Sequence, residues 1–197
     1  MLNWNTITRT QRNWDYDKPV SDEDAELIAE RIRTTLTKQN IPYYDVYYTV
    51  NPKHIQAIFE ISQLQSNTQG QLKAPMLVWF AHDRQYCIDY IKNDVQIPNK
   101  DMQKQKVHFS FGLAVAWTIT AAVDMGYCAG ASQCFDNELV AKYLNENTPY
   151  TFNVDNVLSN VIVGIGHPGP TNYKVTLKGR LQIHNLGQPN VKRKFKV

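Results

Sequence analysis

The stretch Met76-Leu77-Val78-Trp79-Phe80-Ala81 is a continuous apolar run, bounded by Pro75 and by His82-Asp83. A strand with one face in water alternates apolar and polar side chains, and this run shows no such alternation. The run therefore predicts a central strand that is covered on both faces. Helices must then lie above and below it.

The first covering helix is predicted to begin after Ser21. The Ser21 hydroxyl can cap the helix, and Asp24, three residues later, can close a capping box. Apolar residues then recur at helical spacing to about Lys38, with charged residues on the other faces. The apolar stripe, which we expect in the core, consists of Ala25, Ile28, Ile32 and Leu36.

Three further helices are predicted. Asn51-Pro52 suits the cap and the first residue of a short helix. Residues 109–125 are apolar nearly all round and are followed by Gly126, a suitable C-terminal cap residue. Asp136 can cap a further helix that continues through Leu144. A helix as apolar as 109–125 is either central or lies in a subunit interface.

Two more strands are predicted, over residues 45–50 and 160–166. Residues 63–73 are polar and lack an apolar period, so they are predicted to form a loop. The mixed segment 85–106 allows no firm reading. No linker rich in proline, glycine or serine divides the chain, so residues 1–197 are predicted to form one domain.

Composition limits the class of protein. The chain has 197 residues, of which 43% are hydrophobic, enough to fill a core, and a net charge of +3 is too small to indicate a nucleic-acid binder. Cys87, Cys128 and Cys134 form no Cys-x-x-Cys pair, which favours reduced thiols. The sequence begins without a signal-peptide pattern and contains no run as long as a membrane span, so we expect a soluble, cytoplasmic protein.

Several common enzyme motifs are missing from the sequence. It contains no dinucleotide-binding or phosphate-binding glycine loop, no His-Glu-x-x-His and no Gly-x-Ser-x-Gly. The five histidines are scattered, and each is better explained as a surface or structural residue than as a metal ligand. We therefore expect no metal site.

Cationic groups stand near the two ends of the chain. Arg9-Thr10-Gln11-Arg12 offers guanidinium groups and a hydroxyl, which can hold a phosphate by charge-assisted hydrogen bonds. Lys178-Gly179-Arg180 places two cations on the same side of an extended chain, where they can converge on one anion. Each pattern alone is more often a solvated surface.

Taken in chain order, several segments together resemble the motif series of the flavin-dependent nitroreductase family. The segments are Arg9-Thr10-Gln11-Arg12-Asn13-Trp14, Asn40-Ile41-Pro42-Tyr43, Ala74-Pro75, Asp124-Met125-Gly126, Gly164-Ile165-Gly166-His167-Pro168 and Lys178-Gly179-Arg180. The resemblance implies a three-layer α+β fold with a mixed or antiparallel central sheet flanked by helices. It also implies a homodimer with C-terminal arm exchange and one FMN at each of two sites across the dimer interface.

Carried over residue by residue, the resemblance implies a cofactor site. It places Arg9, Thr10 and Arg12 on the FMN phosphate and ribityl chain, with threonine where the family has serine. Lys178 and Arg180 would close over the phosphate. Asn67, seven residues before Ala74, matches an asparagine that hydrogen-bonds the flavin pyrimidine edge, although a polar loop asparagine needs no such role.

Two more segments match in part. Gln133 and Cys134 match the stretch whose backbone N–H lies near flavin N5, with cysteine where glycine is common. Asn40 and Pro42 match part of an Asn-x-Gln-Pro-Trp segment, but its glutamine is absent and Tyr43 replaces its tryptophan. The segment therefore departs from the family pattern at these two positions.

The resemblance implies an FMN-dependent oxidoreductase with ping-pong kinetics. NADH or NADPH would deliver a hydride to flavin N5, and a nitroaromatic, a quinone or a similar electron-poor acceptor would then receive it. No catalytic side chain is predicted, because the flavin carries the chemistry. Three alternatives stay open: a specialised member such as a dehalogenase or a flavin-processing enzyme, a non-catalytic FMN-binding dimer, and nucleic-acid binding by the basic tail 192–196.

Overall fold

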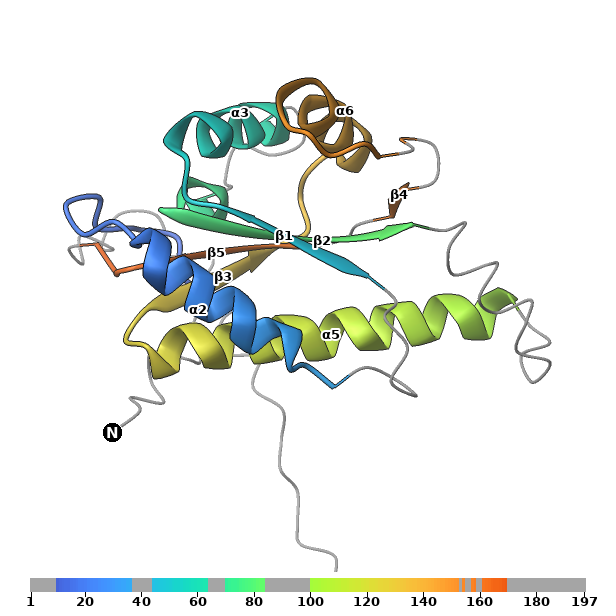
Figure 1. Cartoon of the computed structure of the whole chain (residues 1–197), viewed down its shortest axis with the longest axis horizontal. Coiled ribbons are helices and arrows are strands. Elements are labelled where there is room, and N and C mark those ends of the chain that lie inside the picture. The colour runs from blue at the N-terminus through green and yellow to red at the C-terminus, as the bar shows by residue number, and fades with distance from the viewer. Residues whose placement is uncertain are drawn as a thin grey trace, which may run out of the picture.

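A five-stranded antiparallel sheet forms the middle of the structure (Figure 1). The computed structural model describes residues 10–36, 44–63, 70–83, 100–152, 154, 157–158 and 161–169. The strands within these residues are β1 (Asp45–Thr49), β2 (Met76–Asp83), β3 (Cys128–Ser132), β4 (Val157–Leu158) and β5 (Ile162–Gly166). Their order across the sheet is β1, β2, β5, β3, and β4 pairs with the end of β2.

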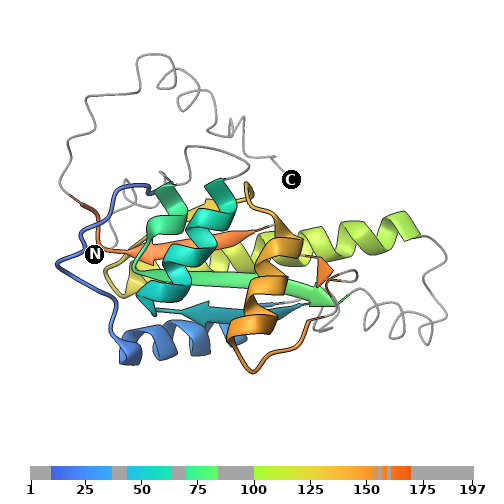
Figure 2. The same ribbon diagram turned by 90° about the horizontal axis from the view of Figure 1, so that it is seen from above.

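Helices cover both faces of this sheet. The helices α3 (Pro52–Gln63) and α6 (Asn137–Asn147) lie on one face, and α2 (Asp22–Arg33) and α5 (Lys100–Asp124) lie on the other. Seen from above, α3 and α6 lie next to each other across the sheet (Figure 2). The short 3-10 helix η2 (Gly70–Lys73) leads into β2. This three-layer α+β arrangement agrees with the predicted fold class, and the strand pairings between described residues are antiparallel.

The central strand is the one that its apolar run predicts. β2 pairs with β1 on one side and with β5 on the other. Met76, Val78 and Phe80 are buried in a core with α2 and α5. Leu77 and Trp79 are buried in a second core with α3 and α6. Because each face of the strand meets helices, every residue of the run can be apolar.

The helix α2 begins as predicted but ends early. The Ser21 hydroxyl accepts a hydrogen bond of 3.1 Å from the Asp24 N–H. The predicted capping box is only half formed, because the Asp24 carboxylate accepts the Tyr127 O–H instead, at 2.5 Å. The helix ends at Arg33 rather than near Lys38, since the hydroxyls of Thr34 and Thr35 donate to carbonyl oxygens one turn back. The prediction that Leu36 lies in the core is wrong, as the residue is 74% exposed.

The other helices differ from prediction mainly at their ends. Asn51 caps α3, accepting a hydrogen bond from the Lys53 N–H. The helix α5 begins at Lys100 rather than at Phe109. Its first residues are lysine, glutamine and other good helix formers without the apolar period on which the prediction relied. Gly126 ends α5 with φ of +87°, as a C-terminal cap requires. Asp136 caps α6, which continues beyond Leu144 to Asn147.

The sequence analysis does not predict three elements, namely β3, β4 and η2. β3 consists of small residues with little strand propensity, and its conformation is fixed by pairing with β5 along its whole length. The end of the predicted loop 63–73 forms η2, in which Gln71 and Leu72 are buried. In the part of the chain that the structure describes, no helix combines the length and the apolar character that crossing a membrane requires.

The contact between Tyr127 and Asp24 leads to a prediction about alkaline stability. Tyr127 is 6% exposed, and its burial together with the hydrogen bond to Asp24 raises its pKa to about 12. The folded protein therefore holds this proton more tightly than the unfolded chain, in which the pKa is about 10. Stability should be unaffected by this group below about pH 10 and should fall as pH rises toward about 12.

We expect Tyr127→Phe to remove this part of the alkaline loss and to cost about 1 kcal/mol at neutral pH, where the hydrogen bond is lost. Urea unfolding of both proteins across this pH range measures the difference in stability. The other tyrosines affect both proteins equally and therefore cancel from this difference. Parallel stability curves for the two proteins would show that Tyr127 does not titrate in this way.

Candidate functional site

A cavity of about 580 Å³ lies between η2, α5 and the end of β3. Its wall includes one residue of η2, four of α5, the end of β3 with the link to α6, and the residue before β5. The lining residues are Gln71, His108, Phe111, Gly112, Val115, Ala131, Ser132, Gln133, Cys134 and Val161. This volume lies in the range of small-molecule and cofactor sites, about 300–1,000 Å³.

The cavity is lined by both apolar and polar side chains. Phe111, Val115 and Val161 give it an apolar wall, whereas Gln71 and Ser132 offer amide and hydroxyl groups. None of the described lining residues is an aspartate, a glutamate, a lysine or an arginine. The lining therefore suits an uncharged group that makes a few directed hydrogen bonds.

A pair of glycines allows three chain segments to meet beside this cavity. Gly130 of β3 lies opposite Gly164 of β5 in the antiparallel register. A Cβ atom on Gly164 would lie 2.0 Å from the carbonyl oxygen of Gln71, and one on Gly130 would lie 2.2 Å from the carbonyl oxygen of Gln11. Only glycine leaves room for such close approach. We call the space above these two residues the glycine notch.

Gln71 occupies the glycine notch and lines the cavity. The residue is 8% exposed, and its Nε2 donates a long hydrogen bond of 3.4 Å to the carbonyl oxygen of Ala131. Its Oε1 is buried and has no hydrogen-bond partner among the described residues. Sequence reasoning missed Gln71, because a glutamine in a polar stretch gives no signal of burial.

The N-terminal segment that contains Thr10 and Arg12 is fixed on the other side of the glycine notch. The Gln11 N–H donates to the carbonyl oxygen of Ala129 at 3.1 Å, and the Gly169 N–H donates to that of Asn13 at 2.9 Å. Trp14 is buried, and its indole N–H donates to the carbonyl oxygen of Gly70 at 2.7 Å. The segment 10–14 is thereby tied to β3, to η2 and to residues after β5.

Four of the predicted cofactor residues are described by the structure. Gln133 and Cys134 line the cavity, and the Cys134 N–H donates to the Ser132 hydroxyl at 3.3 Å. The Arg12 guanidinium donates to the carbonyl oxygen of Thr10 at 3.2 Å, next to η2. Gln133 and Cys134 thus share the cavity wall with Gln71, and Arg12 lies beside Gly70, the residue before Gln71. The other predicted residues, which lie outside the described part of the chain, are Arg9, Asn40, Pro42, Asn67, Lys178 and Arg180.

The described cysteines differ in their surroundings. Cys128 is buried and unbridged, and burial raises the pKa of its thiol. Cys134 is exposed at the cavity and is also unbridged. Among the described residues, no cluster of three His, Cys, Asp or Glu could hold a metal ion.

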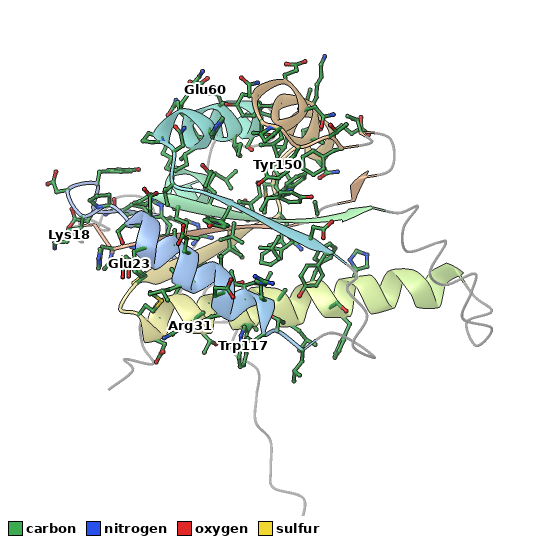
Figure 3. All side chains as sticks on the ribbon, viewed as in Figure 1. Lys18, Glu23, Arg31, Glu60, Trp117 and Tyr150 are labelled. Atoms are coloured by element: carbon green, nitrogen blue, oxygen red, sulfur yellow. The ribbon has the colours of Figure 1, made fainter. Side chains whose placement is uncertain are left out.

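Apolar side chains are exposed along the outer side of α5. Phe109 is 57% and Trp117 is 44% exposed, and Gly112 and Ala116, which follow Phe109 by three and seven residues, are exposed beside Phe109 on the same helix. The Trp117 indole N–H donates to the carbonyl oxygen of Arg31, and Figure 3 shows the two residues side by side where α5 meets α2. We call Phe109, Gly112, Ala116 and Trp117 the outer stripe. Because Gly112 also lines the cavity, the outer stripe and the cavity adjoin.

Comparison with known proteins identifies the fold. A scan against protein-family models finds no match, and a search of curated proteins finds none either. Many solved structures do match, and nitroreductases are frequent among them.

Three of these structures illustrate the match. The NfrA1 nitroreductase of Bacillus subtilis is 16% identical over 85% of this chain, with a TM-score of 0.61, and this chain covers 66% of it, slightly less than two thirds. A proposed NAD(P)H:FMN oxidoreductase of Staphylococcus epidermidis is 13% identical over 86% of this chain and 89% of its own, with a TM-score of 0.64. CLA-ER, an enone reductase of gut-bacterial fatty acid saturation metabolism, is 13% identical over 93% of this chain and 98% of its own, with a TM-score of 0.67. At these identities the match establishes a nitroreductase-like α+β fold, which confirms the resemblance at the level of the fold.

The glycine notch yields a prediction about stability. Gly164→Ala is expected to destabilise the protein by about 2 kcal/mol, because its Cβ would overlap the Gln71 carbonyl and overpacking typically costs about 1–3 kcal/mol. Gly112→Ala is the matched control, since its Cβ would meet nothing within 4 Å. Alanine is favoured over glycine in a helix by about 1 kcal/mol, so this variant should be more stable. Urea unfolding that shows the same sign for both variants would contradict the crowding at Gly164.

Proposed function

We propose that the chain, as one nitroreductase-like domain, is an FMN-dependent NAD(P)H oxidoreductase whose flavin ring occupies the cavity beside Gln71. The observation that carries the proposal is this cavity, in a nitroreductase-like fold, with a buried amide oxygen in its wall that has no hydrogen-bond partner among the described residues. A buried polar atom of this kind normally finds a partner in the protein, a water or a ligand.

The residues around the cavity fit a flavin. The side chains of Phe111, Val115 and Val161 can pack against a flat ring system, and the amides and hydroxyls of the lining can bind its polar edge. The lack of carboxylates among the described lining residues avoids repulsion of a ligand that carries phosphate or gains negative charge.

Each group of residues has a separate task in this proposal. Thr10 and Arg12, together with the predicted Arg9, Lys178 and Arg180, would hold the phosphate. Gln133 and Cys134 would present backbone at the ring, with Asn67, Asn40 and Pro42 as further predicted contacts. FMN, when bound, supplies the two-electron chemistry between NADH or NADPH and an electron-poor acceptor such as a nitroaromatic, a quinone or an enone. The protein's own contribution is to bind and orient these partners and to exclude water.

The outer stripe supports the proposal that the protein is a homodimer. Phe109 and Trp117 are large apolar side chains left in contact with water, and Gly112 and Ala116 beside Phe109 would let a second helix approach closely. A second copy of the chain is the occupant that we propose, because the outer stripe adjoins the cavity through Gly112. Dimerisation there would wall off the open side of each cofactor site.

The absorption spectrum of the purified protein tests the proposed function. We expect a flavin spectrum, either as purified or after addition of FMN, that is bleached anaerobically by NADH or NADPH. Gly112→Leu should prevent FMN binding and yet remain folded, because its side chain would extend into open space at the cavity. A wild-type protein that cannot bind FMN would refute the proposal, and bound flavin that no nicotinamide reduces would leave only a binding protein.

Light scattering after size-exclusion chromatography tests the homodimer. Ala116→Glu places a charge in the middle of the outer stripe and should shift the protein to monomer, since burying an unpaired charge is costly. Gln56→Glu on the exposed side of α3 changes the net charge by the same amount as Ala116→Glu and should leave the dimer intact. Identical masses for wild type and both variants would show that the outer stripe is not the interface.

A further inference from the structure

We infer that Gln71 recognises an N–H donor on the ring of the bound ligand, through its amide oxygen Oε1. The inference rests on the proposed function and deepens it, because it names a residue of the site that the sequence pattern did not indicate. It also states the chemistry of the ligand edge that Gln71 accepts, namely an N–H beside a carbonyl group, as in a cyclic imide.

The position of Gln71 is fixed by its surroundings. Its backbone lies in the glycine notch, where the Gln71 carbonyl oxygen would lie 2.0 Å from a Cβ on Gly164. The Cγ of Gln71 would lie 3.1 Å from a Cβ atom on Gly130. The position of the Gln71 side chain therefore also requires that residue 130 has no Cβ atom. The Gln71 carbonyl also accepts the Ala74 N–H at 3.3 Å. The side chain is therefore held in place before any ligand arrives.

The hydrogen bonds of the Gln71 amide are incomplete. A carboxamide can donate two hydrogen bonds and accept two. One donor is used on the Ala131 carbonyl, at a distance of 3.4 Å, and Oε1 accepts none from the described residues. Because a buried acceptor without a donor is unfavourable, a ligand that supplies an N–H at this point gains affinity.

The same geometry indicates which ligands do not suit the position. A phosphate or a carboxylate presents acceptors only and cannot satisfy Oε1. A cyclic imide presents an N–H flanked by two carbonyl oxygens, and the remaining Gln71 N–H can donate to one of these. The pyrimidine ring of a flavin carries such an imide, with the hydrogen on N3. Gln71 therefore selects for the polar edge of the ring and not for the phosphate end.

FMN binding to Gln71→Leu tests this inference. The substitution keeps a similar size but removes both polar atoms of the amide, so we expect the dissociation constant for FMN to rise about tenfold. The unfolding temperature of the protein without FMN should not fall, because among the described residues the Gln71 side chain loses just the long hydrogen bond to Ala131. Gln56→Leu on exposed α3 is the matched control and should bind FMN as the wild type does.

An N3-methylated FMN provides a second arm that needs no substitution in the protein. The wild type should bind it about tenfold more weakly than FMN, whereas Gln71→Leu should bind the two flavins equally. Equal FMN affinity of wild type and Gln71→Leu would overturn the inference, as would undiminished discrimination by the variant. A wild type that binds no FMN overturns the proposed function itself, so the two failures are distinguishable.

Discussion

The close approach of η2 to the sheet is the constraint on which the candidate site depends. Gly130 and Gly164 face each other on neighbouring strands, and their missing side chains let Gln71 lie directly on the backbone. The same absence lets the N-terminal segment reach Gly130. A methyl group at either position would push η2 or the N-terminal segment away from the sheet. The Gln71 amide and the segment with Arg12 would then no longer meet beside the cavity.

The parts of the fold that depend on local chemistry could be predicted from the sequence. Ser21 and Asp136 accept hydrogen bonds from backbone N–H groups at the starts of their helices, as expected of capping residues. Gly126 ends α5 because only glycine readily adopts its positive φ. β2 was predictable because burial on both faces leaves an unbroken apolar run. In the candidate site, the family resemblance, and no local rule, assigns Gln133 and Cys134 to the cofactor; both line the cavity, and their contact with a cofactor stays a prediction.

The parts that depend on partners far along the chain could not be predicted. β3 is a strand only because β5 pairs with it, and its small residues are what the layer above it requires. Gln71 can be buried because Gly130 and Gly164, much later in the sequence, leave room for it. The apolar character of α5 left open whether the helix is central or at an interface. It is buried on the side of Ala114 and Thr118, while Phe109 and Trp117 on the other side are exposed.

The ties of the segment 10–15 also bear on how the protein is made. Gln11 bonds to Ala129, and Asn13 and Asp15 bond to Gly169 and His167, near the far end of the described chain. On the ribosome this segment is among the first to emerge, and at about 5–20 residues per second its last partners follow on the order of ten seconds later. The pairing of β1 with β2 needs no residue beyond Asp83, whereas the hydrogen bonds of the segment 10–15 need residues as far along the chain as Gly169. The candidate site therefore depends on residues from both ends of the described chain, and its N-terminal side cannot be tied down until residues 167–169 have been synthesised.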